Sequence, residues 1–494
     1  MSVLRLSAFS HRVSIQLNTH LLLLIFGGGL YASLVIIAYS SILSLPLILT
    51  VGALTFWWGR HHDESFLPAF FFFLPLMGCF NNILRVNGIP VLIPIFLSGI
   101  VGGLLSYYFK GERTITVGIP IAVYAFILVS FLSTIVGVIS FLPKHPHLTA
   151  IVSQAPWGEV RLVNALGWIF LGTLVNMTGA IIYLFLIQDH KSDLRRVFTF
   201  LLVGLMGTFF VGLFQFMGWQ FIGESKDFTR FPIPQYNATF MDPNSLGTFI
   251  SLLLPTWLGF MRNKRTPLVF WLGGGGLFFL MMITEARTPF IVFLISFTVL
   301  FFASLFKKDW IMMGIFFCLL MGGMVFSHVH PQNSNVRLRT YVQDLVREIR
   351  KPRDEGKFWN YIVGDRYTLW RAGWITFRHN PILGTGQGTY LVKMPLYKKE
   401  IGHISNDNSC NMFLQIAAEQ GIIGLSAFLF LLGSSFWYFL KYQFKKADML
   451  QVGAFSGLVG LSVAFIFSAP LVNFEVNVLF WFLLALITHP IRLS

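Results

Sequence analysis

Arg287 stands where two apolar runs meet with almost no loop between them. A guanidinium at that depth in a membrane is costly unless it pairs with an acid or faces a polar cavity. Glu285, two residues earlier, could supply the pair, and that interpretation stays open. The alternative is a phosphate-binding arginine, because the guanidinium fork donates two parallel hydrogen bonds to phosphate oxygens and stays charged.

A second arginine, Arg366, opens a segment that the sequence predicts to be helical. Asp365 can cap its first turn. Arg366 and Trp370 are four residues apart, so they share one face of the helix. The helix must stop before Pro381, since proline cannot continue it. We therefore expect Arg366 and Trp370 on one binding surface, with Arg371 as a weaker candidate.

Glycine alternates with other residues in the stretch that follows, at Gly384, Gly386 and Gly388. The spacing superficially matches a dinucleotide-binding fingerprint, but that fingerprint belongs to a strand–helix unit, and the surrounding sequence predicts none. We therefore expect no nucleotide site. The glycines instead predict tight turns and a close approach of the backbone to another group.

A third polar segment spans residues 408–421 and predicts an amphipathic helix. Asn408 or Ser409 can cap it, and Gly421 ends it. Three polar residues spaced by four share one of its faces: Asn411, Gln415 and Glu419. This polar row either binds substrate or lies in the membrane interface as part of an entry helix, and the pattern leaves both open.

Asp242 and Asn244 precede another apolar run, and either one is a reasonable helix cap. Capping alone would explain both residues, and a contact between Asn244 and substrate is the alternative. Residues 338–349 have apolar side chains at helical spacing with basic residues among them. They predict an amphipathic helix that packs on the bundle or contacts anionic lipid or substrate.

The chain as a whole has the composition of a membrane protein. Of its 494 residues, 55% are hydrophobic and only 12% are charged, whereas a soluble domain has roughly 25% charged residues. These values exclude a soluble globular protein and a disordered one. The net charge of +15 would suggest nucleic acid in a soluble protein, but here it fits membrane surfaces or an anionic substrate. We expect no nucleic-acid partner.

Apolar runs between charged breaks predict an all-α polytopic protein, a bundle of about 14 (12 to 14) transmembrane helices of roughly 20 residues each. The predicted spans are residues 20–38, 41–58, 66–80, 89–109, 115–142, 163–187, 197–217, 244–261, 267–284, 288–306, 310–326, 422–440, 450–469 and 474–488. Residues 1–326 hold the first eleven helices, and residues 422–494 hold the last three. Residues 327–421 form one long, largely helical loop between them, and a loop of that length is usually functional.

Lysine and arginine in the short loops indicate the orientation, because cytoplasmic loops carry an excess of both. With fourteen spans, one side holds both termini and most of the basic short loops, including 262–265, 307–308 and 441–446. We therefore expect both termini in the cytoplasm and the long loop, 327–421, outside it.

Five motifs in this order resemble the O-antigen ligase/polymerase superfamily. They are Asp-Pro-Asn-x-x-Gly at 242–247, the Arg287 turn, Arg-x-x-x-Trp at 366–370, Asn-Pro-Ile-Leu-Gly-Thr-Gly-x-Gly-Thr-Tyr at 380–390 and Asn-x-Phe-Leu-Gln-Ile-x-Ala-Glu-x-Gly-Ile-Ile-Gly-Leu at 411–425. Each motif alone is weak, and the five in order, all on the expected external side, are specific. The resemblance covers about 240–440, whereas residues 1–235 add only hydropathy.

The resemblance implies a multi-pass glycosyltransferase of the bacterial inner membrane. Members of the family move a glycan en bloc from an undecaprenyl-pyrophosphate carrier to an acceptor sugar on the periplasmic face, with inversion and without metal or cofactor. The acceptor is lipid A–core in ligases and the next lipid-linked repeat unit in polymerases, and a third branch glycosylates proteins. The expected partners are therefore the lipid-linked oligosaccharide donor, a lipid-linked glycan or lipid A–core acceptor, and membrane lipids.

A lipid pyrophosphate leaving group carries several negative charges, and without a metal fixed cations must stabilise the charge that develops on the leaving oxygen. Arg287 and Arg366 are the first candidates for that role. One position departs from the ligase pattern, because the His before the third-motif Asn is replaced by Cys410. A thiol is a poor general base for a sugar hydroxyl. His403 lies seven residues upstream and could serve, although the spacing does not require it.

The predicted site has two groups of residues. The predicted catalytic residues are Arg287, Arg366, His403 and Cys410. The predicted substrate-binding residues are Trp370, Asn244, Gly384, Gly386, Asn411, Gln415, Glu419, Arg337, Arg339 and Arg371. We expect no metal ligands among them.

The missing His favours an O-antigen or exopolysaccharide polymerase over a ligase, with protein glycosylation as a third branch. A flippase for lipid-linked oligosaccharides is the alternative from another class, since it can also have about fourteen spans. Transporters usually carry polar or broken helices near the midplane, often in repeated halves. Here the polar motifs gather on one face and in one loop, so we expect a transferase. The sugars, their linkage, the chain length and the oligomeric state do not follow from the sequence.

Overall fold

The structure is a computed structural model. It describes residues 44–77, 85–86, 89–90, 92–109, 120–141, 172–173, 175, 177–184, 186–187, 194–218, 236–240, 242–262, 268–284, 286–310, 314, 366–393, 397–401 and 408–488. The predicted span 20–38 and the predicted amphipathic helix 338–349 lie outside these residues.

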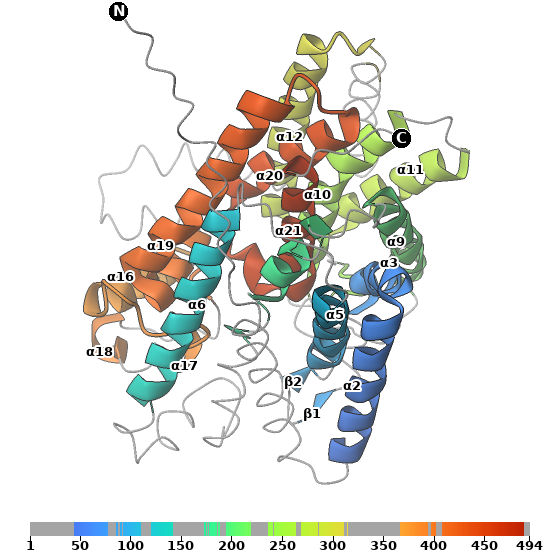
Figure 1. Cartoon of the computed structure of the whole chain (residues 1–494). Coiled ribbons are helices and arrows are strands. Elements are labelled where there is room, and N and C mark those ends of the chain that lie inside the picture. Colours follow the sequence, from blue (N-terminus) through green and yellow to red (C-terminus); the bar gives the residue numbers. More distant parts are fainter. Residues whose placement is uncertain are drawn as a thin grey trace, which may run out of the picture.

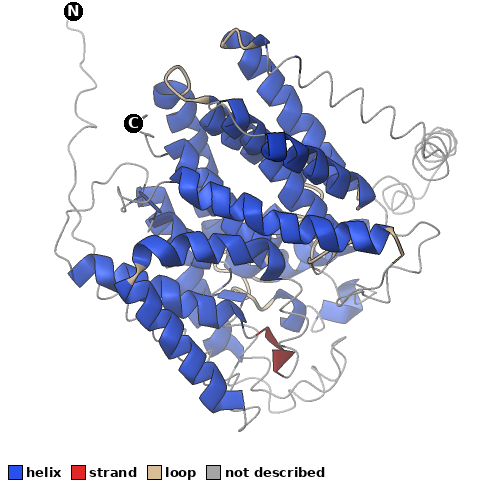
Figure 2. Ribbon diagram, turned by 90° about the vertical axis from the view of Figure 1, so that its right-hand side faces the viewer, coloured by secondary structure: helices blue, strands red, loops and turns tan. Residues whose placement is uncertain are grey.

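Helices make up nearly all of the described chain (Figure 2). The α-helices are α2 (Ser44–His61), α3 (Asp63–Phe73), α5 (Leu92–Phe109), α6 (Pro120–Phe141), α9 (Leu194–Phe216), α10 (Pro243–Arg262), α11 (Leu268–Ile283), α12 (Arg287–Phe306), α16 (Arg366–His379), α17 (Tyr390–Lys393), α18 (Lys398–Ile401), α19 (Met412–Tyr438), α20 (Met449–Ala464) and α21 (Phe474–Thr488). The 3₁₀ turn η2 (Leu74–Leu76) extends α3 and the π turn η5 (Phe439–Gln443) extends α19, and a separate 3₁₀ turn, η6 (Pro470–Val472), lies between α20 and α21. Two strands, β1 (Arg85–Val86) and β2 (Ile89–Pro90), form a minimal antiparallel pair.

The apolar runs predicted most helix positions. The run 244–261 matches α10, 288–306 matches α12, and 474–488 matches α21. The predicted end of α20 at 469 is wrong, because the helix stops at Ala464 and a turn carries the chain to Pro470. Local hydrophobicity places a helix well, but its last turn depends on what it packs against.

Four described stretches are long and apolar enough to cross a membrane. They are Ile121–Ile139, Arg196–Phe216, Thr288–Phe306 and Met412–Gln443. Crossing the hydrocarbon core takes about 20 apolar residues, and further described helices are apolar but shorter. Outer helices also expose large apolar side chains, among them Leu128 and Phe302. The architecture therefore fits a helical membrane protein, and the count of about fourteen spans stays a prediction.

The core of the bundle is built around α10, whose residues from Ser245 to Met261 are all buried. It packs against α20 and α12 (Figure 1). A Cβ atom on Gly453 would lie 2.1 Å from the Pro255 carbonyl oxygen, and one on Gly259 would lie 1.9 Å from that of Met449. Glycine at these crossings lets the helix backbones approach closely, as small residues do between membrane helices.

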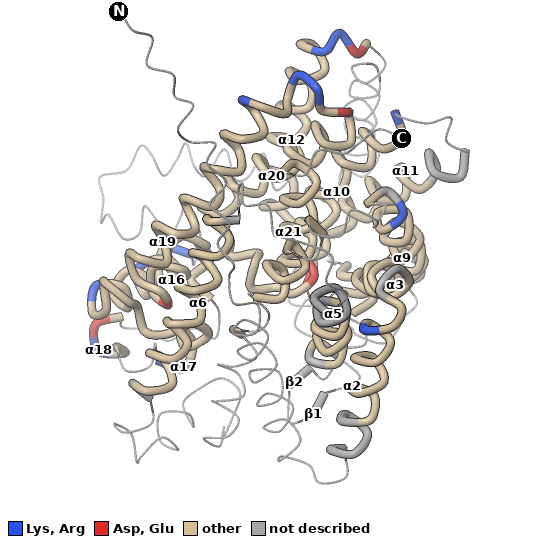
Figure 3. The backbone as a smooth tube through the Cα atoms, viewed as in Figure 1, with Lys and Arg blue, Asp and Glu red and all other residues tan. Residues whose placement is uncertain are grey.

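The helices α10, α12 and α19 run in one direction, and α20 runs back between them. The end of the bundle that we call the motif end holds Pro243, Arg287, Met412 and Ala464. The opposite end, which we call the lysine end, holds Arg262, Phe306, Tyr438 and Met449. Figure 3 shows Lys and Arg gathered where α12 ends and where α19 turns into α20.

Candidate active site

The first turn of α16 lies against the first turn of α12 at the motif end. The Arg366 Nη2 atom donates a hydrogen bond of 3.2 Å to the Thr288 hydroxyl, and Thr288 directly follows Arg287, the first residue of α12. The structure therefore brings the Arg366 side chain to the residue that follows Arg287, although 78 residues separate Arg366 from Thr288. The Arg287 side chain and Glu285 are outside the described part of the chain.

The start of α12 has features of an anion site. Its N-cap residue is Ala286, and no described side chain caps the helix. The amides and dipole at a helix N-terminus favour negative charge, and Arg366 adds a fixed cation beside them. The arrangement can hold a phosphate group at the motif end.

The sequence predicted the end of α16 well, and the predicted cap Asp365 lies outside the described residues. The helix begins at Arg366 and ends at His379, immediately before Asn380 and Pro381. Its Trp370 indole N–H donates a 3.1 Å hydrogen bond to the Cys410 carbonyl oxygen, and its ring centroid lies 6.4 Å from that of Phe467. Trp370 therefore joins α16 to the turn before α19 and to the turn after α20.

Cys410 is the residue with φ +47° in that turn. A non-glycine residue with positive φ is uncommon, and here the Asn408 side chain accepts a 2.9 Å hydrogen bond from the Cys410 amide. The cysteine is half-buried. His403, predicted as a substitute for the missing His, lies outside the described residues.

Our prediction that Asn408 or Ser409 caps the next helix is wrong, because Asn411 caps it. The Asn411 Oδ1 atom accepts a 3.0 Å hydrogen bond from the Leu414 amide at the start of α19. Its Nδ2 atom donates a 3.0 Å hydrogen bond to the Ile466 carbonyl. Asn411 thus positions α19 against the turn after α20, and its role as a substrate contact stays a prediction.

Gln415 and Glu419 both point into the protein. Gln415 Nε2 donates a 2.9 Å hydrogen bond to Glu419 Oε1, and Gln415 Oε1 accepts one of 3.0 Å from the Ser409 amide. The same Glu419 oxygen accepts a 3.3 Å hydrogen bond from the Tyr390 amide. The two side chains therefore connect the turn before α19 to the glycine-rich loop, residues 384–390.

The glycine-rich loop packs closely on α19 and α6. Gly384 and Gly386 have φ values of +68° and +107°. A Cβ atom on Gly384 would lie 2.3 Å from the Glu419 carbonyl carbon, and one on Gly386 would lie 2.2 Å from the Gly137 Cα atom. The predicted close approach of the backbone is thus to the protein's own helices. A contact of Gly384 or Gly386 with substrate stays a prediction.

The sequence predicts that a helix ends at Gly421, and in the structure this glycine kinks α19, which continues to Tyr438. The φ of +66° and ψ of −165° at Gly421 are not helical, and the Ile422 amide after it donates a 2.8 Å hydrogen bond to the Pro381 carbonyl oxygen. A kink at this glycine lets the loop insert its backbone beside α19. The polar segment before Gly421 is thereby set apart from the apolar segment after it.

Arg371 lies on a different side of α16 from Arg366. It is exposed, and its Nη2 atom donates a 3.3 Å hydrogen bond to the Glu400 carbonyl oxygen. The Glu400 carboxylate lies 2.7 Å from His379 Nε2. Arg371 therefore holds α18 to α16. Arg337 and Arg339 lie outside the described residues.

Asp242 caps α10, one of the two caps that the sequence allowed. Its Oδ1 atom accepts a 3.0 Å hydrogen bond from the Ser245 amide, and its other oxygen accepts from the Ser245 hydroxyl. Burial raises the pKa of the Asp242 carboxyl above its ordinary value, and the hydrogen bonds from Ser245 oppose that shift. Asn244 is exposed beside it, where its predicted substrate contact stays open.

Glu475 is a residue that our sequence reasoning missed. It lies in the first turn of α21, is only 5% exposed, and interacts electrostatically with Asp242. Its Oε1 atom has no hydrogen-bond partner among the described residues. Glu475 is the single charged residue in the apolar run 474–488, and an acidic residue in such a run marks a functional site by default.

One comparison with known proteins gives a match over part of this site. Residues 268–429 match a family model described as O-antigen ligase. The match includes α11, α12, α16, α17, α18 and the first two thirds of α19, and it confirms the resemblance drawn from the motifs. A comparison with curated proteins gives no match.

Proposed function

We propose that this chain, a member of the O-antigen ligase/polymerase superfamily through its residues 268–429, moves a glycan en bloc from an undecaprenyl-pyrophosphate carrier to an acceptor sugar. Membership supports a glycosyltransferase-type enzyme of the bacterial inner membrane that acts on lipid-linked glycans. Within the family we propose the polymerase branch, which joins one lipid-linked glycan to the next.

One observation carries this proposal: the Arg366 side chain reaches the first turn of α12, next to Arg287. A lipid pyrophosphate needs fixed positive charge when it leaves. A helix N-terminus without a side-chain cap, with an arginine aimed at it, supplies positive potential without reorganisation.

The reaction that fits this arrangement is a displacement at the anomeric carbon. The acceptor hydroxyl oxygen forms the new glycosidic bond as the bond from that carbon to the pyrophosphate oxygen breaks. The lipid pyrophosphate leaves with the bonding electron pair, and the hydroxyl proton passes to a base. Arg366 and Arg287 would stabilise the charge on the leaving oxygen.

The acceptor side of the site would lie at Trp370 and the turn of residues 408–411. The Trp370 ring is half-buried, and its N–H is already bonded to the Cys410 carbonyl, so the remaining ring face is suited to a sugar. Cys410→Ala should change transfer only mildly, because a thiol is a poor base for a hydroxyl. A complete loss in a glycan-transfer assay would instead place the thiol in the reaction.

The orientation follows from the two ends of the bundle. We propose that the motif end faces the periplasm and the lysine end faces the cytoplasm, with both termini cytoplasmic and about fourteen spans. The excess of Lys and Arg in short loops at the lysine end supports this orientation. Labelling of single cysteines placed at each end in intact cells tests it.

Deletion of the gene in its own host is the first test of function. A surface-glycan ladder that collapses to core plus one repeat would identify a polymerase. Loss of all repeats from lipid A–core, with long lipid-linked chains accumulating, would identify a ligase, the branch favoured by the description of the matched family. Movement of labelled lipid-linked sugar in proteoliposomes without new glycosidic bonds would instead identify a flippase.

A further inference from the structure

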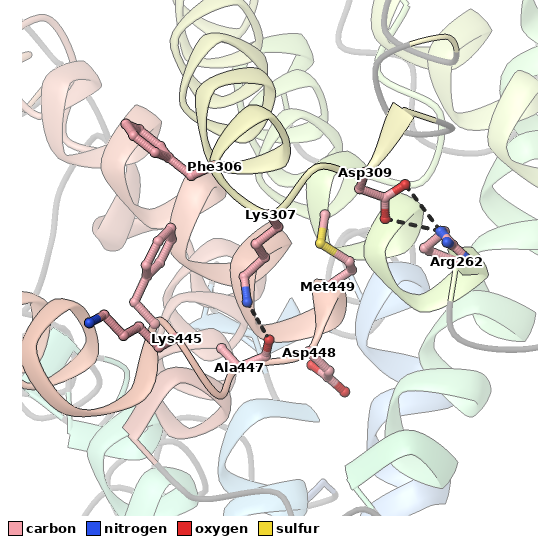
Figure 4. Close-up of a pocket in the computed structure, with 9 residues that line it drawn as sticks. Arg262, Phe306, Lys307, Asp309, Lys445, Ala447, Asp448 and Met449 are labelled. Atoms are coloured by element: carbon pink, nitrogen blue, oxygen red, sulfur yellow. Dashed lines mark hydrogen bonds and ion pairs between the residues drawn. The ribbon is translucent and has the colours of Figure 1, made fainter.

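A pocket of about 610 Å³ opens at the lysine end, far along the helices from the candidate site (Figure 4). Its walls come from the end of α10, the turn after α12 and the turn between η5 and α20. Three cations line it: Arg262, Lys307 and Lys445. Asp309 and Asp448 line it as well, together with aromatic rings.

Both carboxylates already interact with other groups of the protein. The Asp309 carboxylate lies 3.0 Å from Arg262 Nε, so this pair is neutral overall. Asp448 caps α20, because its Oδ1 atom accepts a 2.9 Å hydrogen bond from the Gln451 amide. Asp448 keeps its negative charge, so the positive potential of the pocket comes from Lys307 and Lys445 and is reduced by Asp448.

Lys307 is half-buried, and its ammonium group can donate further hydrogen bonds to a ligand. Its Nζ atom donates a 2.8 Å hydrogen bond to the Ala447 carbonyl oxygen and lies 5.4 Å from the centre of the Phe444 ring. An ammonium group has three donors. Burial lowers the pKa of Lys307, and nearby Asp448 opposes that shift, so an anion in the pocket would stabilise the charged form.

Exposed aromatic side chains lie at the lysine end, and one of them, Phe306, lines the pocket. Phe306 is 79% exposed, and Trp310 beside it is 71% exposed. Lys441 Nζ lies 5.3 Å from the ring centre of Trp437. Trp and Tyr with Lys mark the level of lipid headgroups in membrane proteins. A ligand here therefore meets cations inside the pocket and apolar rings at its edge.

We propose that this pocket binds the phosphate headgroup of an anionic membrane phospholipid, held by Lys307 and Lys445 with its acyl chains against Phe306. The charged residues that line the pocket, three cations and two carboxylates, leave a net charge of +1, which matches the single negative charge of a phosphodiester. The exposed Phe306 ring distinguishes a lipid from free phosphate. The site is separate from the proposed transfer reaction, because it lies at the opposite end of α10, α12 and α19.

Native mass spectrometry of the full-length protein in detergent tests the proposal, with phosphatidylglycerol and phosphatidylcholine as probes. We expect selective retention of phosphatidylglycerol, and about fivefold weaker binding in Lys445→Gln, which removes one exposed cation near the surface. The double variant Lys307→Gln/Lys445→Gln should bind more weakly still. Since Lys445 is exposed, its single variant remains informative even if loss of the Lys307–Ala447 contact impairs folding.

The matched control is Lys308→Gln/Lys446→Gln, which removes two exposed lysines of the same end that do not line the pocket. It should retain phosphatidylglycerol within about twofold of the wild-type protein, since surface charge at a distance is screened. Equal loss in the control and the pocket variants would overturn the proposal, because the attraction would then be unspecific. Equal retention of both lipids, or displacement of phosphatidylglycerol by inorganic phosphate alone, would overturn it too.

Discussion

The two ends of the bundle use polar residues in different ways. At the motif end, short polar side chains and backbone amides bond to each other, as in Asn411 with Leu414 and Glu419 with Tyr390, and glycines bring backbones into contact. The lysine end has a cap and a close glycine contact too, at Asp448 and Gly259, but there long cationic side chains also reach a carbonyl or a ring, as Lys307 does. The first kind of contact fixes geometry closely, whereas the second supplies charge at a surface. A reaction site needs the first, and a membrane interface needs only the second.

We expect the largest effect from a substitution that tests whether glycan transfer takes place at the motif end. Arg366→Ala should lower glycan transfer by at least about 100-fold, since a preorganised charge on the leaving group is lost. Arg371→Ala, on the same helix but bonded to the Glu400 carbonyl, should retain most activity. Both proteins should reach the membrane at normal levels, as measured by immunoblotting. Near-normal transfer by Arg366→Ala would remove that arginine from the site.

The next prediction tests whether close backbone contact matters at the motif end. Gly421→Ala should reduce stability by about 1–3 kcal/mol or more, because the new Cβ atom would lie 2.1 Å from the Ile382 carbonyl oxygen at a φ of +66°. Thermal unfolding in detergent measures the change. Gly433→Ala in the same helix is the control, since nothing lies within 4 Å of its Cβ position. It should stabilise the helix by up to about 1 kcal/mol, and equal effects at both positions would contradict the packing argument.

Substitutions of Glu419 test whether this residue positions its neighbours or contacts the substrate directly. Glu419→Ala leaves the Tyr390 amide and the Gln415 side chain without their acceptor, at a cost of about 1–3 kcal/mol. Glu419→Gln keeps an acceptor oxygen, so it should retain most of the stability and kcat. Thermal unfolding together with kcat and KM for glycan transfer distinguishes the two. A raised KM with normal stability in Glu419→Gln would show that the carboxylate charge contacts substrate.

The smallest effect concerns the cap of α10. Asp242→Ala should cost about 1 kcal/mol of stability through the lost cap, and Asp242→Asn should keep the cap and remove the charge. Because the folded state raises the pKa of Asp242, its favourable contribution is fully present below the ordinary value of 3.8 and is lost as the pH rises through the raised value. Unfolding temperatures across a pH series should therefore fall more steeply with rising pH in the wild-type protein than in Asp242→Asn. Parallel curves would contradict the pKa shift.

The sequence predicted helix positions and their interruptions better than side-chain directions. Pro381 and Gly421 act on their own backbone, so their effects on α16 and α19 could be inferred locally. Glu419 could not be oriented in this way, because the amide that it accepts from belongs to Tyr390, 29 residues away. The cap at Asn411 is a local bond to the Leu414 amide, so the sequence offered it beside Asn408 and Ser409; its second hydrogen bond, to Ile466 in the turn after α20, could not be inferred locally.

Glu475 is a buried acidic residue that the family motifs do not predict. It lies outside the segment that resembles the family, and it meets Asp242 only because α21 packs against α10 in the folded bundle. An isolated acid in an apolar run was the available signal. Arg287 and Arg366, by contrast, were predicted as two separate candidates. The structure brings the Arg366 side chain to the first turn of α12, where Arg287 lies.

The hydrogen bonds that close the start of α19 have a consequence for biosynthesis. The Met412 amide donates to the carbonyls of Phe465 and Ser468, and Asn411 donates to that of Ile466. Because synthesis runs from the N-terminus, α19 is made before these acceptors. The turn with Cys410 can therefore be held in place only after α20 and the turn that follows it have been made. A chain that stops before residue 465 would have Arg366 but would lack the carbonyl groups that hold the start of α19.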